Sequence, residues 1–104
     1  MIKERKSNEG KGKKMPYYAA LLHMQKPELN QTYRPDHLEY LENLVQQGKV
    51  FLKGAFTDGA GGLVIYKADS FEEAKQLAEN DPYIKLGVRK LEMHEWNVSV
   101  PDVN

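Results

Sequence analysis

The stretch V-F-L-K-G-A-F-T-D-G-A-G-G-L-V-I-Y-K, residues 50–67, decides how this 104-residue chain folds. Two runs within it, 50–56 and 63–67, are rich in the β-branched and aromatic residues that favour strands. The connection between them, 57–62, contains three glycines, and a short glycine-rich connection between two strands is typical of a β-hairpin. The middle of the chain is therefore predicted to be a hairpin, and the other elements are placed around it.

A helix is predicted on each side of this hairpin. The helix before it opens with Pro35 and Asp36, which suit the first turn and the positive helix start, and it stops at Gly48. The helix after it opens with Ser70 and Glu73, which have the spacing of a capping box, and runs to about residue 80. The positions predicted to face the core are Leu38, Leu41, Leu44 and Val45 in the first helix, and Phe71, Ala74, Leu77 and Ala78 in the second.

Two further strands are predicted near the ends of the chain. Residues 17–24, Y-Y-A-A-L-L-H-M, are apolar on both faces, and residues 88–98 alternate well enough for a strand. Residues 25–33 are polar and are predicted to form a loop. The resulting order, β-α-β-β-α-β, is that of the ferredoxin-like α+β fold, in which an antiparallel sheet carries both helices on one face. Because the other face is apolar, we predict a homodimer that covers face with face.

The composition limits the class of protein. The chain has no cysteine, which excludes a disulfide framework, thiol catalysis and cysteine-bound zinc or iron–sulfur sites. The same absence is compatible with the cytoplasm, which is the expected location. No apolar run approaches the roughly 18 residues of a membrane span, so no membrane partner is expected.

Charge separates the N-terminal segment from the rest of the chain. Residues 1–14 hold six Lys or Arg against two Glu, whereas the remainder holds nine Lys or Arg against thirteen Asp or Glu. We interpret 1–14 as a basic, disordered extension or the product of an upstream start codon, because Met15 begins a normal-looking strand. Contact with nucleic acid is the weaker alternative, and no nucleic-acid partner is expected. The folded domain is placed at 15–98, with 99–104 as a C-terminal tail.

Two titratable residues are candidates for chemistry. At about 100° per residue, His37 projects between Leu41 and Leu44 and faces the sheet, either as a core residue bonded to a carbonyl or as an acid or base. Asp81 precedes Pro82, which holds it extended and clear of the preceding helix. Its carboxylate is either a solvated helix stop or a partner that orients His37. The sequence alone does not show that the two residues meet.

Other motifs give less support for a site. T-D-G-A-G-G (57–62) lacks both a following helix and the G-x-x-x-x-G-K-[ST] pattern, so a hairpin turn is favoured over a phosphate-binding loop. His23 and His94 lie on predicted strands without a ligand-spaced partner, and we expect them to be packing or interface residues. We therefore expect no metal and no organic cofactor.

Four segments in order resemble the YciI-like (YCII-related) family: R-P-D-H-L-E-Y-L, G-K-V-F-L-K-G-A-F, D-G-A-G-G and A-E-N-D-P-Y-I-K-L-G-V. The likeness runs from about Tyr17 to Trp96 and implies a ferredoxin-like fold that pairs into a dimeric α+β barrel. One departure concerns the Gly-Pro that usually follows the second strand, which is Gly54-Ala55 here. The rim of a pocket near this turn is therefore expected to differ from that of the family.

The resemblance also implies a site and two competing functions. His37 and Asp81 would form an active-site pair, with Arg34 holding an anionic group and Tyr83 lining the pocket. The first function is a small-molecule enzyme of lyase or isomerase type, acting on an anionic or phenolic substrate; a catabolic relative is associated with dehydrochlorination of an aromatic ring. The alternative is a non-catalytic metabolite-binding or regulatory module, and the fold alone does not choose between them.

Overall fold

Four antiparallel strands form one sheet in the order β2-β3-β1-β4. The computed structural model describes residues 16–99 and residue 101, so the predicted 1–14 extension and the last residues lie outside the described part. The strands are β1 (Tyr17–Met24), β2 (Val50–Ala55), β3 (Gly61–Lys67) and β4 (Arg89–Trp96). Both central pairings, β1 with β3 and β1 with β4, are antiparallel. The predicted ferredoxin-like α+β arrangement is therefore confirmed.

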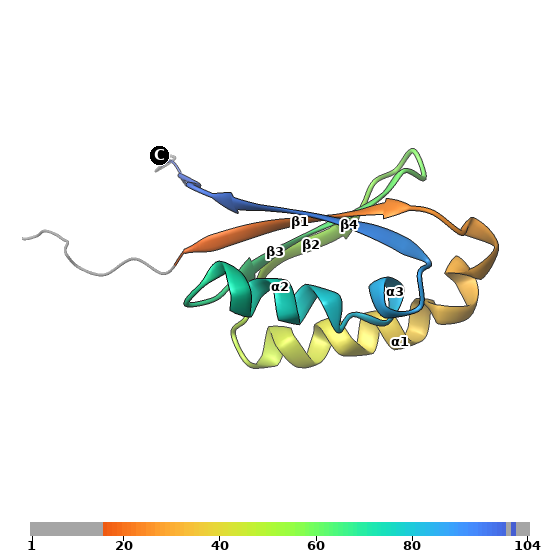
Figure 1. The fold of residues 1–104 in the computed structure, drawn as a ribbon, viewed down its shortest axis with the longest axis horizontal. Helices are drawn as coiled ribbons and strands as arrows, with labels where there is room; N and C mark the ends of the chain where they lie inside the picture. Colours follow the sequence, from red (N-terminus) through yellow and green to blue (C-terminus); the bar gives the residue numbers. More distant parts are fainter. Residues whose placement is uncertain (1–15, 100, 102–104) are drawn as a thin grey trace, which may run out of the picture.

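Three helices lie on one face of this sheet (Figure 1). They are α1 (Pro27–Gln46), α2 (Phe71–Glu79) and the four-residue α3 (Pro82–Lys85), which the sequence analysis did not predict. The core lies between the helices and the sheet, because Tyr18, Ala20 and Leu22 alternate toward the helices and are buried there. The other buried core residues are Leu41, Leu44, Val64, Tyr66, Ala68, Ala74, Ala78, Tyr83 and Val88.

The predicted loop at residues 25–33 is wrong, because α1 already begins at Pro27. Pro27 occupies the first turn, where its missing N–H costs nothing, and the proline taken as the helix start, Pro35, lies inside the helix. The polar segment is anchored by Leu29 and Tyr33, four residues apart, which pack against the core. α1 therefore begins about two turns before Pro35, the start predicted from the sequence.

The buried stripe of α1 also differs from the prediction. Leu41 and Leu44 are buried as expected, and so is His37, which was predicted to face the sheet; Leu38 and Val45, however, are each 36% exposed. In α2, Ala74 and Ala78 are fully buried, whereas Phe71 is half exposed at the edge of the layer. The small alanines lie where α2 packs most closely.

The hairpin turn is shorter than predicted, because Gly61 and Gly62 belong to β3. The Asp58 carboxylate accepts a hydrogen bond from the Ala60 N–H at 2.9 Å, which closes the tip. Gly61 has a φ of 136°, and a Cβ there would lie 1.9 Å from the Leu22 carbonyl oxygen. Only glycine fits at this point, where the backbones of β1 and β3 come together.

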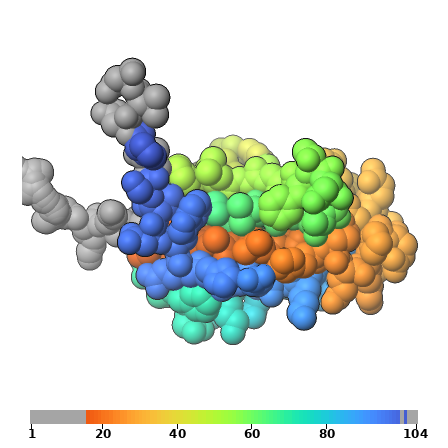
Figure 2. All heavy atoms as spheres, turned by 90° about the horizontal axis from the view of Figure 1, so that it is seen from above, coloured from red at the N-terminus to blue at the C-terminus, as the bar shows by residue number. Residues whose placement is uncertain are grey.

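The sheet face without helices, called here the open sheet face, is seen in Figure 2 with β1 running through its middle. Its apolar side chains come from all four strands: Tyr17, Ala19, Leu21, Leu52, Leu63, Ile65 and Trp96. Leu52 is 57% exposed and Trp96 is 42% exposed, and both border a hollow of about 290 Å³. On β1 and β4, His23 and His94 each contact the Glu92 carboxylate. Among the described residues, no helix is long and apolar enough to cross a membrane.

Candidate functional site

Asp81 is held between two helices by its own backbone and side chain. Its φ of −62° and ψ of 129° are extended, as the following proline predicts, and α2 has ended at Glu79. The side chain is also the N-cap of α3, where Oδ1 accepts a hydrogen bond from the Tyr83 N–H at 2.9 Å. Asp81 has no exposed surface, so the alternative of a solvated carboxylate at a helix stop is wrong.

The structure brings His37 and Asp81 together. The His37 Nδ1 lies 2.9 Å from both carboxylate oxygens of Asp81, and the His37 residue is only 8% exposed. A carboxylate only accepts hydrogen bonds, so Nδ1 carries the proton and the neutral ring has an unprotonated Nε2. Among residues 16–99, Nε2 has no hydrogen-bond partner. The pair therefore leaves one basic nitrogen available for a bound molecule.

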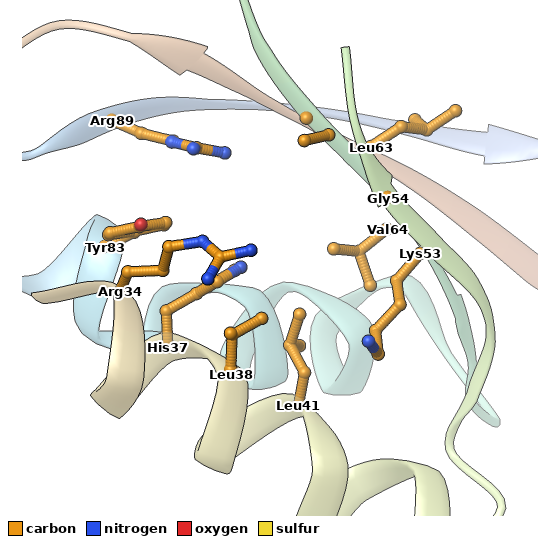
Figure 3. Close-up of a pocket in the computed structure, with 12 residues that line it drawn as sticks. Arg34, His37, Leu38, Leu41, Lys53, Gly54, Leu63, Val64, Tyr83 and Arg89 are labelled. Carbon is orange, nitrogen blue, oxygen red and sulfur yellow. The ribbon is translucent and has the colours of Figure 1, made fainter. Parts of the chain in front are cut away.

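Tyr83 fixes the plane of this imidazole. Its ring stacks on His37 with the centroids 4.1 Å apart and the planes 21° apart. The Arg89 guanidinium lies over the Tyr83 ring, 4.3 Å from its centroid, so that Tyr83 is placed between Arg89 and His37 (Figure 3). The Tyr83 hydroxyl donates to the Asn30 carbonyl oxygen at 3.0 Å. Burial raises the pKa of Tyr83, although Arg89 and Arg34 act against it.

Two more tyrosines surround the Asp81 carboxylate. Burial and the nearby Asp81 charge raise the pKa of Tyr40 to about 12, and they raise the pKa of Tyr66 further. The Tyr40 hydroxyl donates to the Leu77 carbonyl at 2.6 Å. Within the described residues the buried Tyr66 hydroxyl has no partner. The carboxylate thus lies near neutral phenols, and the His37 Nδ1–H is its hydrogen-bond donor.

A pocket of about 200 Å³ opens beside His37 and Tyr83 (Figure 3). The predicted residues His37, Tyr83 and Arg34 all line it, whereas Asp81 lies behind His37. The side chains of Leu38 and Leu41 give it an apolar wall. Its remaining lining residues are Lys53, Gly54, Ala55, Gly62, Leu63, Val64 and Arg89. The residues Gly54 and Ala55, where the sequence departs from the family pattern, are therefore part of its wall.

Three residues of the site were missed from the sequence. Arg89 opens β4 and is 7% exposed, and Asn30 lies in the segment that was taken for a loop. Lys53 lines the pocket from β2. A positive residue at the start of an otherwise alternating strand was the available signal for Arg89. No group of three or more His, Cys, Asp or Glu side chains in the described part is arranged to hold a metal ion.

Comparisons with known proteins agree with this fold. The profile of the YCII-related domain matches residues 15–97. An uncharacterized protein of Bacillus subtilis (strain 168), YjpA, is 32% identical over 82 residues, which is 79% of this chain and 96% of YjpA. A solved structure of 5-chloro-2-hydroxyhydroquinone dehydrochlorinase (TftG) from Burkholderia phenoliruptrix AC1100, in complex with 2,5-dihydroxybenzoquinone, superposes with a TM-score of 0.69. The superposition covers 80% of this chain and 95% of TftG at 22% identity.

Proposed function

Because this chain belongs to the YCII-related domain family, we propose that it is a small-molecule enzyme of lyase or isomerase type. The observation that carries the proposal is the buried His37–Asp81 pair, whose Nδ1 contact at 2.9 Å leaves Nε2 free beside the pocket. The position of Nε2 beside the pocket is that of a general base. TftG, a dehydrochlorinase with a similar fold, performs an elimination, which is a reaction of the proposed type.

The proposed chemistry starts with proton transfer to His37. Nε2 removes a proton from a carbon or hydroxyl of the substrate, and the ring becomes an imidazolium that Asp81 stabilises. In an elimination the electron pair of the broken C–H bond forms a double bond, and the leaving group departs as an anion. In an isomerisation the imidazolium returns the proton to a different atom. Neither route draws on a metal or an organic cofactor, in line with the expectation from the sequence.

The developing negative charge on the substrate needs positive groups around it. Arg34 lines the pocket from α1, and its side chain is exposed enough to meet a ligand that enters from solvent. We propose that Arg34 binds an anionic or phenolic oxygen and that Tyr83 forms part of the wall against which the ligand lies. The substrate class is then a small anion or phenol.

A homodimer through the open sheet face belongs to the same proposal. The exposed Leu52 and Trp96 are part of an apolar face that extends over all four strands. A second copy is the partner that matches this face best, because two-fold pairing covers the same residues on both chains. We also propose a cytoplasmic location, as expected from the absence of cysteine.

A turnover screen on phenolic and enol-type acids tests the proposal. His37→Ala and Asp81→Asn should each abolish most of any activity found, and the double variant should be little worse than either single one, as for residues of one catalytic unit. Asp36→Asn is the matched control, because Asp36 is an exposed carboxylate on the same helix. Additive losses would contradict the His–Asp unit. Saturable binding without turnover of any screened acid would favour the alternative, a non-catalytic binding module.

A further inference from the structure

Arg89 is a buried cation that is fixed in place by two neighbours. It is 7% exposed, and its Nε and Nη2 both donate to the Asn30 side-chain oxygen, at 3.2 and 2.9 Å. The guanidinium also lies over the Tyr83 ring, with Cζ 4.3 Å from the centroid. Since Asn30 and Tyr83 are themselves joined by a 3.0 Å hydrogen bond, the three residues form one preorganised group.

This group leaves one edge of the guanidinium unused. Asn30 occupies the edge formed by Nε and Nη2, so the N–H groups of Nη1 and the second one of Nη2 have no partner among the described residues. The free Nη1–Nη2 edge presents two parallel N–H groups, which is the arrangement that binds a carboxylate through two hydrogen bonds. Arg89 lines the pocket, and its guanidinium extends into it (Figure 3).

Gly62 provides the room for this arrangement. A Cβ at position 62 would lie 3.1 Å from the Arg89 Nη1 and 2.7 Å from the Gly54 carbonyl oxygen. Any side chain there would push the guanidinium away from its present place. The absence of a side chain at position 62 therefore leaves space for the Arg89 guanidinium in the pocket wall.

The charge balance of the pocket is positive. Arg34 and Lys53 line it together with Arg89, and within residues 16–99 no carboxylate lies within 4.0 Å of any of these three cations. The nearby acid, Asp81, is paired with His37. Burial lowers the pKa of Arg89, because the charge has been removed from water. A buried charge without a counter-ion from the protein is expensive, and a bound anion lowers this cost.

The volume of the pocket limits the size of that anion. An apolar cavity of roughly 150 Å³ holds one benzene molecule, and this pocket has about 200 Å³. One ring with a few substituents therefore fits inside it. The apolar wall made by Leu38, Leu41 and Val64 suits the face or edge of such a ring.

We infer that Arg89 is the main anion-binding residue of the pocket, and that the ligand is a single-ring compound whose carboxylate binds the free Nη1–Nη2 edge. This inference rests on the proposed function only in using the same pocket. Arg34, on the solvent side, is then free to contact a second oxygen of the ring. Asn30 is a positioning residue, because it acts on the ligand through Arg89.

The probes that test this are 2-hydroxybenzoate and its neutral analogue 2-hydroxybenzamide, titrated into the full chain by calorimetry. The wild-type protein should bind the carboxylate at least tenfold more tightly than the amide. Arg89→Gln should remove this preference, and Arg89→Lys should restore only part of it, because lysine lacks the planar fork. Lys90→Gln is the matched control, since Lys90 is the exposed neighbour on β4, and it should leave the preference unchanged.

A second variant keeps the inference testable if the Arg89 variants fail to fold. Asn30→Asp puts a permanent carboxylate against Arg89, so the preference for the carboxylate probe should fall at least tenfold while the arginine remains. No saturable binding of 2-hydroxybenzoate to the wild-type protein, or an unchanged preference in Arg89→Gln, overturns the inference. Carboxylate binding through Arg89 without turnover of any acid would overturn the proposed enzyme and leave this inference standing.

Discussion

Replacing Asp81 by asparagine separates the charge of this residue from its shape. Asparagine is as good an N-cap as aspartate, so the hydrogen bond from the Tyr83 N–H is kept. The amide nitrogen then takes the place of Oδ2, which lies 2.9 Å from the His37 Nδ1. The Nδ1–H would then have only Oδ1 as an acceptor, 2.9 Å away, and Oδ1 already accepts from the Tyr83 N–H. The amide donor beside it favours a ring whose Nδ1 is unprotonated and can accept. We therefore expect the proton to move to Nε2, so that His37 no longer presents a basic nitrogen to the pocket.

The stability cost follows from the same contacts. A hydrogen bond to a charged group contributes about 1.5–3 kcal/mol and a neutral one about 0.5–1.5 kcal/mol, so Asp81→Asn should cost about 1–1.5 kcal/mol. For a domain of this size that lowers Tm by about 5–10 °C. Asp81→Ala removes the N-cap of α3, which costs about 1 kcal/mol. It also leaves the buried His37 Nδ1–H without an acceptor, which costs about 1–3 kcal/mol. The alanine variant should therefore cost about 2–4 kcal/mol.

Two measurements check this reasoning. The ¹⁵N chemical shifts of the His37 ring at alkaline pH distinguish an Nδ1–H from an Nε2–H tautomer, and thermal unfolding at one fixed protein concentration gives the stability difference. Asp36→Asn serves as the control, because it removes an exposed carboxylate from α1. A wild-type ring that carries its proton on Nε2 would refute the tautomer argument. An alanine variant no less stable than the asparagine variant would refute the contribution of the cap.

Three further predictions concern the rest of the fold. Light scattering at micromolar concentration should give twice the chain mass, and Leu52→Lys with Trp96→Lys should give a monomer; a wild-type monomer would contradict pairing through the open sheet face. Tyr66→Phe should leave stability unchanged or raise it by about 1 kcal/mol, because the buried hydroxyl has no partner within the described residues. The raised pKa of Tyr66 also makes stability depend on pH, because above pH 10 the unfolded chain loses the Tyr66 proton before the folded chain does. The free energy of unfolding of the wild type should therefore fall by up to about 1.4 kcal/mol per pH unit above pH 10. Urea titrations at several pH values should find a smaller fall per pH unit in Tyr66→Phe. Gly61→Ala should lower the chemical-denaturation midpoint severely, since its Cβ would clash with the Leu22 carbonyl at 1.9 Å; a loss below about 1 kcal/mol would show that β1 and β3 adjust.

The fold class could be predicted because its signals are local. The hairpin, the Ser70 cap, the apolar run 17–24 and the alternation of 88–98 each depend on residues close together in the sequence, and the structure confirms their order. Even there the detail differs, because the Glu73 carboxylate accepts from the Asp69 N–H rather than from that of Ser70. Neighbouring residues therefore predict which element forms but not each bond at its ends.

The start of α1 and the helix α3 could not be predicted in this way. Pro27 and Pro35 both have the composition of a helix start, and only the packing of Leu29 and Tyr33 on the core decides for the first. The turn at Asp81 was predicted as a stop, but its side chain also begins the next helix. Such choices depend on tertiary contacts, which outweigh local preference.

The candidate site was predictable in part for a similar reason. His37 faces the sheet because of helical spacing, which is a local property. The contact of Arg89 with Asn30 joins residues 59 positions apart, and the segment around Asn30 had been taken for a loop. The sequence therefore marked Arg89 only as a positive residue at the start of an alternating strand, and it did not show that the residue is buried against Asn30.

The double role of Asp81 has a consequence for how such a pocket can diverge. The same carboxylate starts α3 and holds His37, so few substitutions at this position would leave both the backbone and the imidazole in place. Arg34, by contrast, is exposed on the rim, where exchange disturbs little of the core. New ligand preferences on this scaffold would therefore arise through changes at the rim, while the His37–Asp81 pair is inherited intact.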